Sequence, residues 1–144
     1  MPIPSTRQED MGVFMGKMPE VDDNHQIAEM AFKVNVLTKA ASCTILASES
    51  GSFITDYGAG APVVYTLPAA EDGLNYLFYA ATATHTLTVA AATAIMVTDA
   101  NVAATSVGLE TASDIIGGAI QVVSDGSKWF AFAYIDEGQI LIVA

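Results

Sequence analysis

Residues 119–135 read AIQVVSDGSKWFAFAYI, and this stretch decides the fold class. Two runs rich in Val, Ile, Phe, Tyr and Ala flank the segment Ser-Asp-Gly-Ser at residues 124–127. An Asp-Gly pair between two alternating apolar runs is the strongest short-range signal of a β-hairpin. Phe130, Phe132 and Tyr134 stand at alternate positions of the second run and therefore share one face, which we expect to lie in the core.

Upstream of this hairpin, short runs of Val, Ile, Thr, Tyr and Phe alternate with Gly, Asp, Asn and Ser, a pattern typical of many short strands. We expect strands at residues 42–46, 53–55, 62–68, 74–80, 85–90 and 94–97. Prolines at both ends of residues 62–68 indicate an edge strand. Residues 99–108 are small and polar and indicate a long loop. The apolar residues 140–144 predict a paired last strand or a buried contact.

These runs predict an all-β domain over residues 41–144, built as an antiparallel β-sandwich or barrel of the jelly-roll kind. Residues 1–40 differ in composition, because they hold four of the five basic residues and five of the six methionines. We interpret them as an extended N-terminal arm. Residues 22–32 favour one or two helical turns within it.

Composition limits the classes of function. With 144 residues, the chain has the size of one domain with an appended arm. Its apolar fraction of 52% is ample for a core, whereas its net charge of −11 disfavours nucleic acids and anionic membranes as partners. No run of about 20 apolar residues is present, nor a secretory signal, so we expect synthesis in a cytoplasm. A single cysteine allows no disulfide within the chain.

Residues able to perform chemistry are few. Cys43 lies in an expected strand without a basic neighbour that would lower its pKa. His85 begins another expected strand. His25 follows Asp22 and Asp23, but this isolated spacing is weak evidence for a metal site. We therefore expect no catalytic residue, no metal ligand and no cofactor, and we expect that the protein is not an enzyme.

Three segments carry a resemblance to a known group of proteins. Residues 50–55 read SGSFIT, and residues 58–78 read GAGAPVVYTLPAAEDGLNYLF. Residues 124–129, SDGSKW, follow as a closing hairpin. In this combination the chain resembles small virion proteins of bacteriophages, and in particular the head decoration (cement) proteins of tailed phages. The resemblance extends from about Cys43 to Tyr134 and leaves the arm out.

The resemblance implies a structural protein on the outer surface of the capsid, where it stabilises the shell by bridging neighbouring capsomers. Its partners would be the major capsid protein and other copies of itself, as a homotrimer. The resemblance offers no catalytic residue. In the arm, Met11, Phe14, Met15 and Met18 are adaptable apolar side chains that suit an interface with the shell or the next subunit.

Two alternatives remain open. A tail or fibre module that binds host glycans would need exposed aromatic side chains, for which Trp129 and Tyr57 are candidates. A metal-assisted hydrolase would need Asp22, Asp23 and His25 to converge, with or without His85. We rank the structural role first, the glycan module second and the hydrolase last.

Overall fold

The computed structural model describes residues 20–21, 27–29, 33–92, 96–97, 103–109, 116–134 and 140–143. The chain divides into two compact units, Met1–Lys33 and Val34–Ala144. The division falls before the boundary expected at residue 40, because residues 36–38 pair with a strand of the second unit. The proposed interface residues Met11, Phe14, Met15 and Met18 lie outside the described residues.

In the first unit, β1 (Glu20–Val21) pairs antiparallel with β2 (Ile27–Glu29). The helical turns expected over residues 22–32 are therefore wrong at Ile27–Glu29. Ile27 is β-branched and loses side-chain freedom in a helix, whereas pairing with Val21 satisfies its backbone as a strand.

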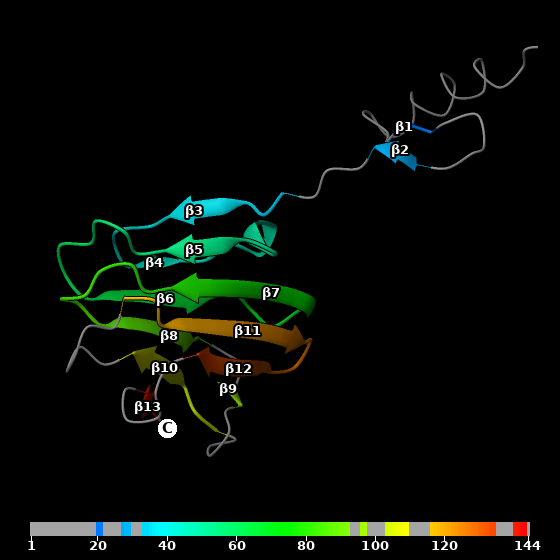
Figure 1. Ribbon diagram of the computed structural model, residues 1–144. Coiled ribbons are helices and arrows are strands. Elements are labelled where there is room, and N and C mark those ends of the chain that lie inside the picture. The colour runs from blue at the N-terminus through cyan, green and yellow to red at the C-terminus, as the bar shows by residue number, and fades with distance from the viewer. Residues whose placement is uncertain are drawn as a thin grey trace, which may run out of the picture. The chain divides into compact units, whose positions relative to one another are not determined.

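The second unit is all-β, as expected, and its strands lie in two sheets (Figure 1). In the described part of the chain, one sheet has six strands in the order β3-β5-β7-β11-β12-β9, and the other has five in the order β13-β10-β8-β6-β4. The strands are β3 (Val36–Thr38), β4 (Cys43–Thr44), β5 (Phe53–Thr55), β6 (Val63–Leu67), β7 (Asp72–Tyr79), β8 (Leu87–Ala91), β9 (Met96–Val97), β10 (Ser106–Leu109), β11 (Ala119–Asp125), β12 (Trp129–Tyr134) and β13 (Ile140–Val143). A 3₁₀ helix, η1 (Ala47–Glu49), follows β4.

Strands β3 to β8 alternate between the two sheets and wind as a coil of three turns. Each turn contributes one strand to each sheet: β3 and β4, then β5 and β6, then β7 and β8. Successive turns stack in parallel, with Val36 opposite Phe53 and Phe53 opposite Leu77 in the six-stranded sheet. In the five-stranded sheet, Tyr65 lies opposite both Cys43 and Val89.

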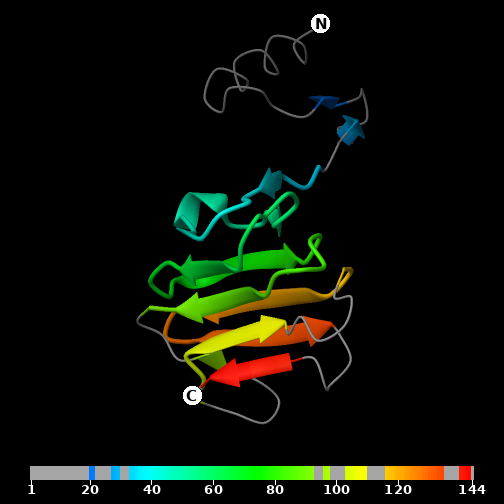
Figure 2. The ribbon, with the colours of Figure 1, turned by 90° about the vertical axis from the view of Figure 1, so that its left-hand side faces the viewer.

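The remaining strands close the coil mainly in antiparallel fashion. Strand β10 pairs with β8, and β13 pairs with β10, as the view in Figure 2 shows. Strand β11 pairs with β7 and forms a hairpin with β12, while β9 joins β12 in parallel. The expectation of antiparallel sheets is therefore wrong for the coil, because a chain that changes sheet after every strand returns to each sheet in the same direction.

Two local expectations also fail. The segment at residues 62–68 is not an edge strand, because β6 lies between β4 and β8. Its prolines stand just outside the paired residues Val63–Leu67, where no ladder N–H is required. The loop expected over residues 99–108 instead includes the start of β10, because Val107 pairs with Val89 of β8. The paired last strand is confirmed as β13.

The hairpin that decides the fold class is confirmed. Six residue pairs join β11 to β12, from Ala119 opposite Tyr134 to Ser124 opposite Trp129. The turn is held by the Asp125 carboxylate, whose Oδ1 accepts hydrogen bonds from the backbone N–H groups of Ser127 and Lys128, each at 2.9 Å. Hydrogen bonds from Ser127 and then Lys128 hold the pKa of Asp125 below its ordinary value. Gly126 adopts φ 91°, which other residues rarely reach.

Both sheets bury side chains in one shared core. Tyr65 of β6 and Phe78 of β7 are fully buried, and their rings stack with centroids 5.3 Å apart. Trp129 is fully buried and its ring lies 5.9 Å from that of Tyr76. The expected orientation of β12 is wrong, because Trp129 points inward, leaving Phe132 53% exposed on the opposite face.

No described residue belongs to a helix long and apolar enough to cross a membrane.

Two neighbouring valines of β6 test this assignment of faces. Val63 is buried and Val64 is 40% exposed. We expect Val63→Ala to lower the free energy of unfolding by about 2 kcal/mol, because it removes two buried methyl groups and leaves a cavity. Val64→Ala should cost less than about 0.5 kcal/mol. Urea denaturation followed by Trp129 fluorescence measures both values, and equal losses would contradict the inward position of Val63.

Candidate functional site

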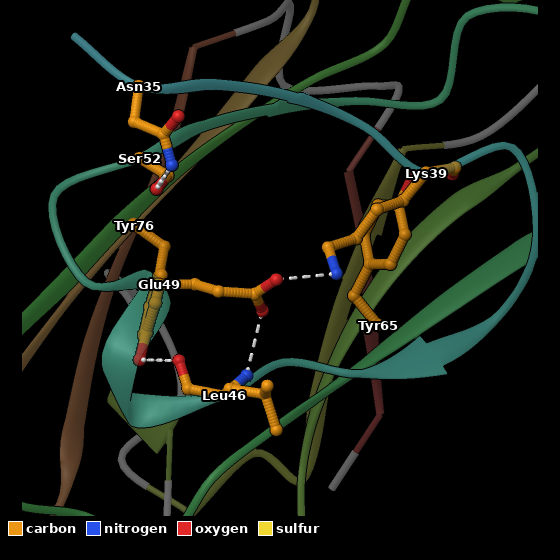
Figure 3. Close-up of polar contacts among 7 residues, drawn as sticks. All are labelled: Asn35, Lys39, Leu46, Glu49, Ser52, Tyr65 and Tyr76. Carbon is orange, nitrogen blue, oxygen red and sulfur yellow. Dashed lines mark hydrogen bonds and ion pairs between the residues drawn. The ribbon is translucent and has the colours of Figure 1, made fainter.

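A group of polar contacts among seven described residues lies around the first turn of the coil. We call it the first-turn network; Figure 3 shows its side chains. Its members are Asn35, Lys39, Leu46, Glu49, Ser52, Tyr65 and Tyr76. They come from the segments on either side of β3, from the segment around η1, and from β6 and β7. The network therefore connects the first turn of the coil to the two turns that follow.

Two tyrosines reach from the core into this network. The Tyr65 hydroxyl donates to the Lys39 carbonyl at 2.6 Å, and the Tyr76 hydroxyl donates to the Leu46 carbonyl at 3.0 Å. Burial raises the pKa of Tyr76 to about 12, with nearby Glu49 and Glu71 adding to the effect. Burial, with Asp56 and Cys43 nearby, raises the pKa of Tyr65 as well. Both phenols consequently remain protonated and act as hydrogen-bond donors.

Lys39 and Glu49 form the charged part of the network. The Lys39 ammonium lies 2.8 Å from Glu49 Oε1, and Glu49 Oε2 accepts a hydrogen bond from the Leu46 N–H at 2.9 Å. Burial alone would raise the pKa of Glu49, but the hydrogen bond from Leu46 and the contact with Lys39 together lower it. A carboxylate with a lowered pKa is a weak base. The contacts of Glu49 with Lys39 and Leu46 hold the chain around η1.

Cys43 lies beside this network. Its side chain is partly buried and packs against the core, and burial raises the pKa of its thiol more than nearby Lys39 lowers it. A raised pKa keeps the sulfur as the thiol, which is a poor nucleophile. The position agrees with the interpretation of Cys43 as a strand residue.

Asp56 is fully buried after β5. Its Oδ1 accepts a hydrogen bond from the Ala81 N–H at 2.6 Å, and its backbone carbonyl accepts one from the Thr82 hydroxyl at 3.0 Å. Its Oδ2 has no hydrogen-bond partner among the described residues. Asp56 therefore joins the loop after β5 to the segment between β7 and β8.

The metal ligands considered from the sequence are not brought together in the part of the chain that the structure describes. Asp22, Asp23 and His25 lie outside the described residues, and His85 is half-buried just before β8. Among the residues with described positions, no three His, Cys, Asp or Glu side chains form a group that could hold a metal ion.

The second feature of interest is the outward face of the six-stranded sheet. Its apolar side chains define what we call the aromatic face: Val36, Phe53, Leu77, Tyr79, Val97, Val123, Phe130, Phe132 and Tyr134. Phe132 is 53% exposed and Tyr134 is 55% exposed. Phe53 and Tyr79 contact one another with ring centroids 5.5 Å apart. The face is therefore a largely apolar surface carried by the strands β3, β5, β7, β11, β12 and β9.

Polar groups on the aromatic face are neutral in the middle of the described strands. Gln121 lies opposite Phe132, and its Oε1 accepts a hydrogen bond from the Tyr134 hydroxyl at 2.8 Å. Charge enters only near the hairpin turn, where Lys128 lies 5.7 Å from the centre of the Phe130 ring, beside Asp125. This arrangement favours contact with an apolar or aromatic surface.

The aromatic face is not expected from the sequence, because both sides of β12 are apolar. Trp129 and Ala131 lie on one side, and Phe130 and Phe132 lie on the other. One signal could have found it: a hairpin with the observed register places polar Gln121 on the same face as Phe132. A glutamine in mid-strand indicates the solvent-facing side.

The outward face of the five-stranded sheet is different. On β4, β6, β8 and β10, the outward positions carry small side chains with one valine: Thr44, Val64, Thr66, Thr88, Ala90 and Ser106. Small side chains offer little apolar area to a partner. The two outward faces therefore differ in aromatic content while both are uncharged at these positions.

No protein-family model matches this chain, and no curated protein matches it.

The first-turn network predicts a pH dependence of stability. At neutral pH, Glu49→Gln should lower the free energy of unfolding by about 1 kcal/mol, because the ion pair with Lys39 is lost. The pKa of Glu49 is lower in the folded state than its unfolded value of about 4.3, so its stabilisation is present above that value and is lost as the pH falls through the folded pKa. The difference between the two proteins should therefore shrink between about pH 5 and pH 3.

Urea denaturation at a series of pH values measures this difference. Glu71→Gln is the matched control, because Glu71 is exposed and forms no ion pair among the described residues. Its effect should stay within about 0.5 kcal/mol at every pH. A loss for Glu49→Gln that stays constant down to pH 3 would contradict the role of the charged carboxylate.

Proposed function

We propose that this protein is a structural virion protein, a decoration (cement) protein that binds the outer surface of a phage head and stabilises it by bridging capsomers. The observation that carries the proposal is the division of the chain at Lys33 and Val34. The β unit has its own core and its own polar network among the described residues, and we propose that the N-terminal unit contacts another molecule.

Three further features support the proposal. Residues 50–78 and 124–129 resemble phage decoration proteins in sequence. Residues 40–144 hold ten acidic residues and one basic residue, so copies repel one another except through matched contacts. The aromatic face offers such a contact. The partners we propose are the major capsid protein and further copies of the chain, as a homotrimer; the site of synthesis is the host cytoplasm.

The architecture that we propose for the β unit is a two-sheet sandwich. Support comes from the separate strand orders of the two sheets and from the core that they share. We also propose that the N-terminal unit acts as an extended arm, in which Met11, Phe14, Met15 and Met18 are the anchors.

A tail or fibre module that binds glycans is the second candidate. It is favoured by the exposure of Phe132 and Tyr134 on a sheet face that also carries Gln121, because aromatic rings beside amides suit sugar stacking and hydrogen bonding. Tyr57 is 69% exposed and remains a candidate, whereas Trp129 is fully buried and is removed from this list. Glycan-array binding that is lost in Phe132→Ala would favour this candidate.

The first proposal predicts separate roles for the two units. Deleting residues 1–33 should abolish binding to the phage heads, because it removes the arm and its apolar anchors. The β unit should remain folded, because Asn35 and the rest of the first-turn network are retained. Co-sedimentation with heads that lack the protein measures binding, and circular dichroism measures folding.

Full-length Val64→Ala is the matched control and should bind as the unmodified chain does, because it changes only the face of small side chains. A truncated chain that still binds heads would contradict the proposed role of the arm. Electron cryomicroscopy of the virion gives the second test: density on the outer shell would support the decoration role, and density confined to the tail would favour the glycan module.

A further inference from the structure

The sequence contains two Asp-Gly pairs, Asp72–Gly73 and Asp125–Gly126, and the structure gives them different surroundings. The two aspartates lie opposite one another on the neighbouring strands β7 and β11. An Asp-Gly bond is especially prone to isomerisation, because glycine has no Cβ to shield the nitrogen that attacks the aspartate side chain. The two pairs therefore present one reaction in two environments within the same chain.

The reaction needs only the chain and water. The glycine nitrogen forms a bond to Cγ of the neutral aspartic acid, and the side-chain hydroxyl leaves as water with the amide proton, so that a succinimide ring remains. A second water molecule opens this ring at either carbonyl carbon. Opening at Cγ restores aspartate, whereas opening at the main-chain carbon gives isoaspartate, in which the main chain runs through Cγ. The mass of the chain is unchanged.

Hydrogen bonds oppose this reaction at Asp125. Its Oδ1 accepts hydrogen bonds from the backbone N–H and the hydroxyl of Ser127 and from the Lys128 N–H, each at 2.9 Å. The Gly126 N–H, whose nitrogen would have to attack, donates to the Ser124 hydroxyl at 3.1 Å. The hydrogen bonds from Ser127 and then Lys128 hold the pKa of Asp125 below its ordinary value, so less of the neutral acid is present. Attack at Asp125 therefore requires these bonds to break first.

The side chain of Asp72 is not restrained in this way among the described residues. It is exposed, and its carboxylate accepts no hydrogen bond and forms no ion pair in the part of the chain that the structure describes. No bond of this carboxylate therefore has to break before Cγ can approach the Gly73 nitrogen.

The main chain at Gly73 also has room to move. Gly73 and Leu74 stand opposite Ser124 alone, because the register between β7 and β11 shifts at this point. Such a bulge disrupts the ladder locally and weakens its resistance to the change of backbone angles that ring closure requires. Gly73 has φ 85°, and no atom lies within 4 Å of the position that a Cβ would occupy. At Gly126 the same position lies 3.5 Å from the backbone nitrogen of Asp72, so the hairpin turn is packed against β7.

We infer that Asp72 is a site of spontaneous modification to isoaspartate in the folded protein, and that the hairpin turn protects Asp125 from the same change. The product carries one more main-chain atom at the start of β7, the strand between β5 and β11. Because Asp72 is the first residue of β7, the change leaves the pairs from Asn75 to Tyr79 in register. The inference is independent of the proposed function.

The test follows isoaspartate at both pairs while the full-length chain is stored at physiological temperature and mildly acidic pH. Chymotrypsin, which cleaves after Tyr76, places the two pairs in separate peptides, whereas trypsin leaves them together because no Lys or Arg lies between Lys39 and Lys128. Electron-transfer fragmentation in a mass spectrometer distinguishes isoaspartate from aspartate of equal mass. In the folded chain, isoaspartate should form at Asp72 at least about fivefold faster than at Asp125, because hydrogen bonds must be lost at Asp125 first.

Denaturation provides a control that does not require a variant. In concentrated guanidinium chloride both pairs lose their folded surroundings, and the two rates should agree within about twofold. A difference that persists there would overturn the inference, since it would show that the flanking residues, and not the fold, set the rates. Equal rates in the folded chain, or a faster rate at Asp125, would also overturn it.

Two variants test the two sites separately. Asp72→Glu should abolish isoaspartate in its own peptide, because the longer side chain would have to close a larger ring, and it should leave the rate at Asp125 unchanged. Ser124→Ala removes the acceptor of the Gly126 N–H and should raise the rate at Asp125 by about fivefold, with Asp72 as the unchanged site in the same chain. Circular dichroism establishes that each variant is folded. A folded Ser124→Ala variant whose rate at Asp125 is unchanged would contradict the protection of that site.

Discussion

The side chain of Tyr65 connects the two sheets of the β unit with the first turn of the coil. Its ring is fully buried and stacks on Phe78 of the opposite sheet, so it helps to hold the two sheets together. Burial of its hydroxyl without a hydrogen-bond partner would cost free energy of folding. The hydroxyl donates to the Lys39 carbonyl in the first turn of the coil. The core and the first-turn network are therefore joined through one side chain, whose pKa is raised by burial and which remains a donor.

The winding of the coil explains why the first turn needs this support. Strands β3 and β4 are the terminal strands of the two sheets, and each pairs on one side only among the described residues. Short strands at a sheet edge have few backbone hydrogen bonds of their own. Contacts from Lys39, Glu49 and Tyr76 supplement those bonds. The charged pair also places Lys39 near this edge, which discourages unwanted strand addition.

The arrangement of charges accords with a protein whose role is assembly. In the proposed role, its acidic groups would repel other copies, and the aromatic face, whose mid-strand positions are uncharged, would be free to meet a partner. The carboxylate of Glu49 is already engaged by Lys39 and Leu46 within the chain, and that of Asp56 is buried. Specificity would then come from the apolar face and from the N-terminal unit, and the surrounding charge would limit other contacts.

The sequence by itself determined the all-β class and the hairpin about Asp125 and Gly126, because turn chemistry and two-residue alternation are local properties. From their apolar composition it predicted a paired last strand or a buried contact at residues 140–144, and the structure shows the strand. Only the tertiary structure decided that successive turns stack in parallel, that β6 is an interior strand and that β10 begins at Ser106, because strand pairing depends on distant residues. The orientation of β12 was likewise decided only by the tertiary structure. Both sides of that strand are apolar, so burial of Trp129 against Tyr76, and with it the exposure of Phe132, was decided by packing between strands far apart in the sequence.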